Sequence, residues 1–136
     1  MVNLGWNSNK IKRVVGSTLA AEALSQRSAL DHAIFLRAIF AEILGVNPLD
    51  ILIVSYIDSN NLLEAASSTK FVDDKKLRLD IAQIQESVRE ENIEIKWVKT
   101  HDMLADSLTK NGVNSSNLLQ VLSSGRFEEE KKEKIE

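Results

Sequence analysis

A run of apolar residues at positions 51–58 constrains the fold of this chain more than any other feature. It reads Ile-Leu-Ile-Val-Ser-Tyr-Ile-Asp, and its first four residues are aliphatic with no polar alternation. Such a run predicts a strand that is covered on both faces, as in a parallel or mixed sheet flanked by helices. Ligands of open sheets lie outside the carboxyl ends of the strands, so Asp58 is well placed for chemistry. The structural alternative is that Asp58 caps the next helix or closes an Asx turn.

A long helix is predicted before this strand, over residues 19–44, with Ser17 or Thr18 as its N-cap and Gly45 at its end. One face of this helix carries Glu22, Gln26, Ala29, Ala33, Leu36 and Phe40. We therefore expect Glu22 in the first turn, on the extension of an apolar stripe. A carboxylate at that position either interacts favourably with the helix N-terminus or holds a cation.

The other elements follow from periodicity and turn residues. The pattern predicts a hairpin over residues 2–15, with its turn at 7–9, before the long helix. After the strand at 51–58 it predicts a short helix through 62–65, an amphipathic helix over 73–91 and a strand over 93–97. Two further helices are predicted over 103–110 and 117–122. Asp106 falls in the first turns of the helix over 103–110, where an acidic residue also suits the helix dipole. The succession of strands and helices predicts an α/β fold.

The composition limits the classes of protein to which this chain can belong. Its 136 residues, 43% hydrophobic and 27% charged, suit one soluble domain. The absence of Cys excludes a disulfide scaffold, a thiolate zinc site and a Cys nucleophile, and it suits an intracellular protein. No apolar run approaches the roughly 18 to 20 residues of a membrane span, and the N-terminus lacks a signal-peptide core.

A net charge of -3 gives no overall basic footprint, so a nucleic-acid contact would need a local basic patch. The densest basic cluster in the middle of the chain consists of Lys70, Lys75, Lys76 and Arg78. These residues suit contact with a phosphate backbone, and they equally suit an ordinary solvated helix face.

Three carboxylates share a pattern. Asp58 ends a strand, whereas Glu22 and Asp106 fall near the starts of two helices. Two divalent metals about 4 Å apart, held by several carboxylates, can activate a water and stabilise the leaving oxygen in phosphodiester cleavage. Mg²⁺ prefers such oxygen ligands. Strand-end and helix-start carboxylates can converge on one sheet edge, which makes these three a candidate metal site.

Several segments also match known motifs in a specific order. They read Gly-Trp-Asn-Ser-Asn-Lys at 5–10, Ser-Thr-Leu-Ala-Ala-Glu-Ala at 17–23, Asp-Ser-Asn at 58–60, Leu-Asp-Ile at 79–81, Trp-Val-Lys-Thr at 97–100 and Leu-Ala-Asp-Ser-Leu-Thr-Lys at 104–110. In this order they resemble motifs of the ribonuclease H domain in copia-type retrotransposon Pol (reverse transcriptase) polyproteins. Those motifs are Trp-Ser-Ser-Lys, Ser-Thr-Glu-Ala-Glu-Tyr, Asp-Asn or Asp-Ser, hydrophobic-Asp-Ile, and Val-Pro-Thr followed by Leu-Ala-Asp-hydrophobic-Leu-Thr-Lys. The resemblance extends from residue 5 to about residue 127.

This resemblance implies a ribonuclease H-like mixed sheet flanked by helices, and a nuclease that cleaves RNA in RNA–DNA hybrids with two Mg²⁺ or Mn²⁺ ions. By position, Glu22, Asp58 and Asp106 match three of the family's four metal-binding carboxylates. The family's first Asp, from an opening strand, has no counterpart. We therefore expect an N-terminally incomplete domain over 1–127 that lacks its first strands, followed by a charged tail over 128–136. Cleavage by this piece is expected to be weak or absent.

The resemblance also implies binding partners and a cellular location. We expect an RNA–DNA hybrid or other nucleic acid and the rest of a Pol polyprotein as partners, with an open sheet edge available for pairing with another chain. The cytoplasm or nucleus is the expected location, or a virus-like particle for an active element. The alternative, from a different class, is a domesticated, non-catalytic binding or oligomerising module that retains its carboxylates by ancestry.

Overall fold

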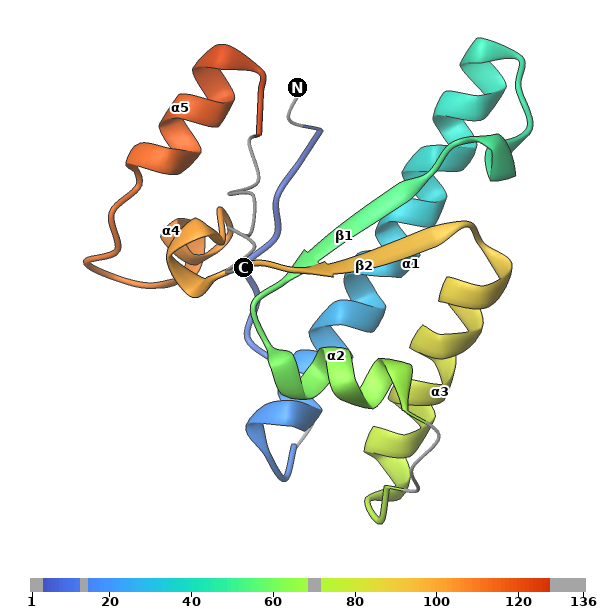
Figure 1. Cartoon of the computed structure of the whole chain (residues 1–136), viewed down its shortest axis with the longest axis vertical. Helices are drawn as coiled ribbons and strands as arrows, with labels where there is room; N and C mark the ends of the chain where they lie inside the picture. Colours follow the sequence, from blue (N-terminus) through green and yellow to red (C-terminus); the bar gives the residue numbers. More distant parts are fainter. Residues whose placement is uncertain (1–3, 13–14, 69–71, 128–136) are drawn as a thin grey trace, which may run out of the picture. The chain divides into compact units, whose positions relative to one another are not determined.

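The computed structural model describes residues 4–12, 15–68 and 72–127 (Figure 1). The chain divides into two compact units. The central unit comprises residues 11–97, and the terminal unit combines residues 1–10 with residues 98–136. Lys70, one of the basic residues singled out above, and the predicted tail over 128–136 lie outside the described residues.

The central unit is a mixed α/β structure. Its elements are α1 (Thr18–Leu44), the 3-10 helix η1 (Pro48–Asp50), β1 (Ile53–Ile57), α2 (Asn60–Ser67), α3 (Lys75–Glu90) and β2 (Ile93–Trp97). The two strands are parallel, with Ile53 opposite Ile93 and Ile57 opposite Trp97. They form a two-stranded sheet within the described part of the chain. The predicted α/β class is therefore confirmed. The expectation of a strand covered on both faces is met only in part, because Ile57 is the one buried residue of β1 and the others are half-buried.

Local signals at both ends of α1 define its length. The Ser17 hydroxyl accepts a hydrogen bond from the backbone N–H of Ala20 at 3.1 Å, which satisfies one of the free donors of the first turn. Gly45 ends the helix with a φ of 68°, a left-handed conformation that glycine adopts without steric cost. The predicted helix over 19–44 is thus confirmed to within one residue.

The core of the central unit lies between α1, α3 and the sheet. Its buried side chains are Ala20, Ala23, Leu30, Ile57, Leu62, Leu77, Ile81, Ile84 and Ile93. In Figure 1, α1 and α3 lie beside the two strands, and α2 follows the end of β1. Leu77, Ile81 and Ile84 of α3 are buried, as their helical spacing predicts.

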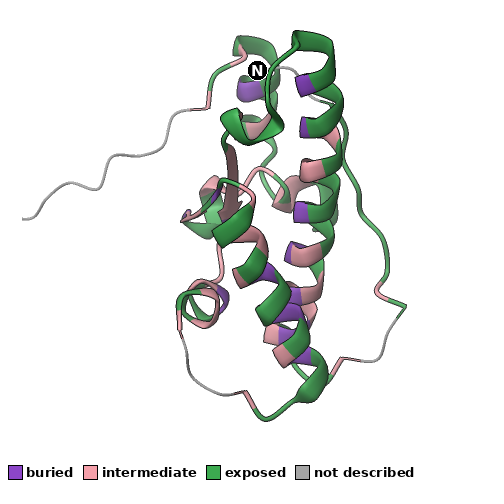
Figure 2. Cartoon of the chain, turned by 90° about the vertical axis from the view of Figure 1, so that its right-hand side faces the viewer, coloured by how far each residue is buried: buried purple, intermediate pink, exposed green. Residues whose placement is uncertain are grey.

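The prediction for the buried face of α1 is only partly right, because Gln26 is buried as expected but most of the buried residues are others. The buried residues of α1 are Ala20, Ala23, Gln26, Leu30, Arg37 and Ala41. Ala29 and Phe40, both on the predicted stripe, are exposed. Figure 2 shows the buried residues as a narrow band along one side of this long helix, with exposed residues over much of the remainder. The true stripe includes Gln26 and Arg37 because each finds a hydrogen-bond partner inside the unit.

The terminal unit contains η2 (Thr100–Asp102), α4 (Asp106–Thr109) and α5 (Ser116–Ser124). The helix predicted over 103–110 is reduced to the four residues of α4, whereas the helix predicted over 117–122 is confirmed as α5 and ends at Gly125, as expected. In the parts of the chain that the structure describes, no helix has the length and apolarity needed to cross a membrane.

The predicted N-terminal hairpin is wrong over residues 4–12, which contain no strand. Its remaining residues at 2–3 and 13–14 lie outside the described residues. At the predicted turn, the side-chain amide of Asn9 donates to the side-chain oxygen of Asn7, and the residues from 4 to 10 are exposed. An isolated strand pair without a packed face is only marginally stable, so apolar residues flanking a polar turn do not suffice to form a hairpin.

Candidate functional site

Two side-chain hydrogen bonds define the direction of α1 relative to β1. Near the C-terminal end of α1, Nη1 of Arg37 donates to the carbonyl of Ile51, just before β1, at 3.4 Å. Nearer the N-terminal end, Nε2 of Gln26 donates to Oγ of Ser55 within β1, at 2.8 Å. Moving toward the N-terminus of α1 therefore means moving toward the C-terminus of β1, so the helix and the strand are antiparallel.

Glu22 and Asp58 both lie at the carboxyl end of β1 as a consequence. Glu22 precedes Gln26 by one helical turn on the same face, about 6 Å nearer the helix N-terminus. Asp58 directly follows Ile57 and stands about 10 Å beyond Ser55 along the strand direction. Both residues are half-buried. The central unit thus brings two of the three candidate carboxylates to the same end of the fold.

The backbone around Asp58 is held by its neighbours. The indole Nε1 of Trp97, the last residue of β2, donates to the carbonyl of Asp58 at 3.2 Å. The hydroxyl of Ser59 accepts from the backbone N–H of Leu62 at 3.2 Å and caps α2. Because Ser59 is the N-cap, the alternative explanation of Asp58 as a helix-capping residue is wrong.

Glu22 lies one residue farther into its helix than expected. It is the fifth residue of α1, and the first turn of this helix contains no acidic residue. The favourable interaction with a helix N-terminus falls off within the first turn. The expectation that Glu22 sits in that turn is therefore wrong. A favourable interaction with the helix N-terminus is accordingly a weaker explanation for an acidic residue at this position than the sequence suggested.

Asp106 belongs to the terminal unit, where it is the first residue of α4. Its Oδ2 accepts a hydrogen bond from Nζ of Lys110 at 2.8 Å, and its side chain is only 14% exposed. The partner lies four residues along the chain, which is the spacing of neighbours on one helical face. The Asp106 carboxylate therefore has a partner on its own helical face.

Two carboxylates supply part of what a divalent ion requires. Within neither unit do three or more His, Asp or Glu side chains of the described residues gather as a metal-binding group. Mg²⁺ is commonly bound through one or two carboxylates, with water and substrate phosphates completing its octahedron. Glu22 and Asp58 fit such a partial ligand set by their chemistry and by their place at the carboxyl end of β1.

The candidate phosphate-binding residues differ in their surroundings. Lys75 and Lys76 are exposed in the first turn of α3. Arg78 is half-buried, and its Nε donates to the carbonyl of Val72 at 2.9 Å. Its Nη2 also donates to the carbonyl of Asp73 at 3.4 Å. Arg78 therefore holds the segment before α3, which leaves the two lysines as the better candidates for contact with phosphate.

A buried ion pair between α1 and α3 was not anticipated as a site feature. Asp80 is fully buried, and its Oδ1 lies 3.0 Å from Nη1 of Arg27. A signal for this burial exists in the sequence, because Asp80 stands at helical spacing from the apolar residues Leu77 and Ile84. An acidic residue on an apolar stripe requires a partner, which the sequence alone does not identify.

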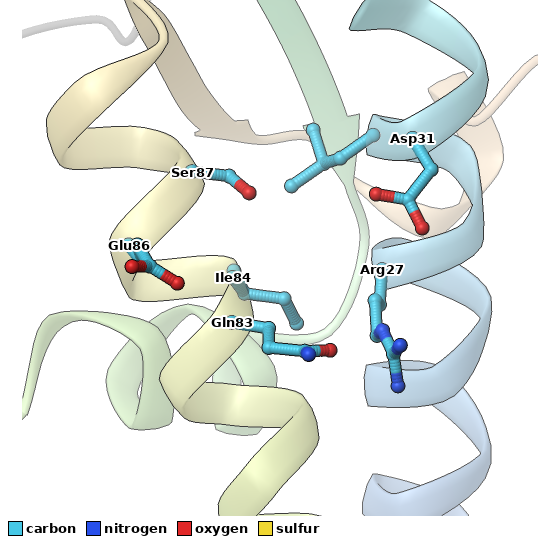
Figure 3. Close-up of a pocket in the computed structure, with 7 residues that line it drawn as sticks. Arg27, Asp31, Gln83, Ile84, Glu86 and Ser87 are labelled. Atoms are coloured by element: carbon cyan, nitrogen blue, oxygen red, sulfur yellow. The ribbon is translucent and has the colours of Figure 1, made fainter.

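A hollow of about 220 Å³ lies beside this pair, between α1 and α3 (Figure 3). It is lined by Arg27, Leu30 and Asp31 of α1 and by Gln83, Ile84, Glu86 and Ser87 of α3. In Figure 3 the side chain of Gln83 extends from α3 toward α1, and Asp31 lies on the opposite wall. The lining combines the guanidinium of Arg27 with the carboxylates of Asp31 and Glu86, so its charges are mixed in sign.

Comparison with protein-family models, curated proteins and solved structures found no match to this chain.

Proposed function

We propose that this chain is a ribonuclease H-like domain of a retrotransposon polyprotein, with a metal site for the hydrolysis of RNA in RNA–DNA hybrids. The observation that supports this most is the position of Glu22 and Asp58 at the same end of the central unit. That end is the carboxyl end of β1, where ligands of open α/β sheets bind. The order of the motifs along the chain supports the same assignment.

In this proposal the carboxylates of Glu22 and Asp58 are ligands for Mg²⁺ or Mn²⁺. Divalent ions supply the water activation and the charge stabilisation that phosphodiester hydrolysis needs. The protein holds the ligands on rigid elements. Trp97 and Ser59 hold the backbone around Asp58, and the packing of α1 positions Glu22. Such fixed ligands lower the cost of arranging a site when the ion binds.

Asp106 is the proposed third ligand, on the strength of its motif. Its carboxylate is paired with Lys110, whose side chain is 54% exposed. Lys75 and Lys76, exposed on α3, are the proposed contacts to the phosphate backbone of the hybrid.

A thermal melt with divalent ions tests this proposal directly. Ions that bind only the folded state stabilise it by about 1.4 kcal/mol at ten times the dissociation constant. We expect Mg²⁺ or Mn²⁺ to raise the Tm of the wild type, and we expect Glu22→Gln or Asp58→Asn to abolish this rise. Asp50→Asn, which removes an exposed carboxylate from η1, is the matched control and should leave the rise unchanged.

The same titration separates the proposal from its alternative. If neither ion changes the wild-type Tm, the carboxylates are inert and the chain is better explained as a non-catalytic binding or oligomerising module. An equal rise in all of the variants would assign the ions to another part of the surface.

Cleavage of a labelled RNA–DNA hybrid is the second test. The family's first carboxylate has no counterpart among these residues, so we expect cleavage at most slightly above background in Mn²⁺ or Mg²⁺. Any cleavage that depends on this site should disappear in Asp58→Asn. Robust cleavage that survives this substitution would contradict the assignment of the site.

A further inference from the structure

An exposed turn follows α4 at Asn111 and Gly112. Both residues lie beyond Thr109, where α4 ends, and both are exposed. Gly112 has a φ of 78°, a left-handed conformation that glycine adopts without steric cost. Asparagine is followed directly by glycine only at this position of the chain. Because glycine has no side chain, the backbone nitrogen of Gly112 is not shielded from the Asn111 side chain.

No contact holds the two reacting groups of this turn in place. Among the residues that the structure describes, no hydrogen bond engages the side-chain amide of Asn111 or the backbone N–H of Gly112. Apart from its chain neighbours, Gly112 has open space where a Cβ would stand, with no atom within 4 Å of that point. Exposed connecting segments are more mobile than the elements they join. The nitrogen of Gly112 is therefore free to approach Cγ of Asn111.

Other asparagines of the chain are held by their side chains. Oδ1 of Asn114 accepts a hydrogen bond from the backbone N–H of Ser116 at 2.9 Å. Nδ2 of Asn92 donates to the carbonyl of Leu49, also at 2.9 Å. Each of these bonds must break before the side chain can turn toward the next backbone nitrogen. The surroundings of Asn111 therefore differ from theirs in the direction that favours reaction.

We propose that Asn111 is a site of spontaneous deamidation. The backbone nitrogen of Gly112 loses its proton to a base in the solvent and bonds to Cγ of Asn111. The bond from Cγ to the side-chain nitrogen breaks, and that nitrogen leaves as ammonia. Water then opens the resulting cyclic imide at either carbonyl, which gives aspartate or isoaspartate at this position. Water is the co-reactant and no group is oxidised or reduced, in keeping with the thermal lability of asparagine.

The modification changes the charge and the backbone at the end of α4. Either product carries a carboxylate, which takes the formal net charge from -3 to -4 by one added charge. The new carboxylate directly follows Lys110, whose Nζ lies 2.8 Å from Oδ2 of Asp106. Isoaspartate also inserts an extra carbon into the backbone of the turn. The reaction needs neither metal nor nucleic acid, so it does not depend on the proposed nuclease role.

Incubation of the whole chain in mildly alkaline buffer, followed by tryptic mapping with mass spectrometry, tests the proposal. Cleavage after Lys110 and Arg126 releases one peptide that carries Asn111, Asn114 and Asn117. We expect conversion at Asn111 to be at least about fivefold faster than at Asn114, since one ordinary hydrogen bond alone is worth that factor. The rate should increase with pH, because the attacking nitrogen must lose its proton.

Isoelectric focusing of two matched variants provides the control. In Asn111→Gln the side chain is one methylene longer and would have to close a larger ring, so the more acidic form should disappear. Asn114→Gln changes an exposed asparagine of the same segment in the same way, and it should still acidify like the wild type. Far-UV circular dichroism should confirm that both variants are folded. A wild type that never acidifies, acidification that persists in Asn111→Gln, or modification mapped to Asn114 in place of Asn111 would overturn the proposal.

Discussion

The central and terminal units are held together in different ways. In the central unit, α1 and α3 share buried side chains, Arg27 of α1 pairs with Asp80 of α3, and Arg37 of α1 pairs with Glu91, which directly follows α3. In the terminal unit, α4 has no buried residue, and its carboxylate is paired within its own turn. Long-range packing therefore sets the positions of Glu22 and Asp58, whereas short-range contacts set the surroundings of Asp106.

The buried polar groups explain why the central unit has a single register. Along α1, Arg27 pairs with Asp80 and Arg37 pairs with Glu91, so α1 and α3 run in the same direction. A shift of either helix by one turn would separate the buried Asp80 and Arg37 from their charged partners, which costs several kcal/mol for each of these two ions. Apolar packing alone would tolerate such a shift more easily, so the ion pairs select one arrangement of the helices.

Removal of the Arg37 side chain should produce the largest loss of stability. Its guanidinium donates to the carbonyls of Ile51 and Glu91 and to the Glu91 carboxylate. We expect Arg37→Ala to lower the free energy of unfolding by about 3 to 5 kcal/mol, as measured by urea denaturation. Arg89→Ala removes an arginine whose side chain is 72% exposed, and it should change stability by less than about 1 kcal/mol. Similar losses in the two variants would contradict the structural role of Arg37.

A pair of apolar truncations compares the two units directly. Ile84 is fully buried between α1 and α3, whereas Leu119 of α5 is 61% exposed. We expect Ile84→Ala to cost about 2 to 5 kcal/mol, and we expect Leu119→Ala to cost less than about 0.5 kcal/mol. A larger loss from Leu119→Ala would show that α5 is held by packing as strong as that of the central unit.

Helix caps provide the smallest of these comparisons. The Ser17 hydroxyl caps α1, whereas Ser115, at the same position before α5, makes no side-chain cap hydrogen bond. Ser17→Ala should therefore lower the free energy of unfolding by about 1 kcal/mol. Ser115→Ala should leave it nearly unchanged. An equal loss of stability in the two variants would contradict this difference in helix capping between the two units.

Elements with strong local signals could be predicted from the sequence. Ser17 and Gly45 mark the ends of α1, and the spacing of Leu77, Ile81 and Ile84 marks the buried side of α3. These signals act over a few residues, through caps and periodicity, so they can be recognised in the sequence without knowledge of the tertiary structure. The same is true of the two strands, whose apolar runs and turn residues are local.

The buried side of α1 could not be predicted, because it depends on partners far away in the sequence. Arg37 lies off the predicted apolar face, and its burial is explained only by the carbonyl of Ile51, which accepts its hydrogen bond. Phe40 has the chemistry of a core residue, yet it is exposed. The candidate site, too, could be predicted only in part. The sequence indicates that Glu22 and Asp58 end or begin elements, but only the antiparallel packing of α1 on β1 brings them to one end.

Paramagnetic broadening by Mn²⁺ is the most direct test of the central claim that Glu22 and Asp58 form one cation site. In the nuclear magnetic resonance spectrum of the ¹⁵N-labelled chain, substoichiometric Mn²⁺ should broaden the backbone amide signals around Glu22 and around Asp58 together. Both effects should disappear in Asp58→Asn. Broadening at only one of the two positions, or broadening that persists in Asp58→Asn, would contradict the account.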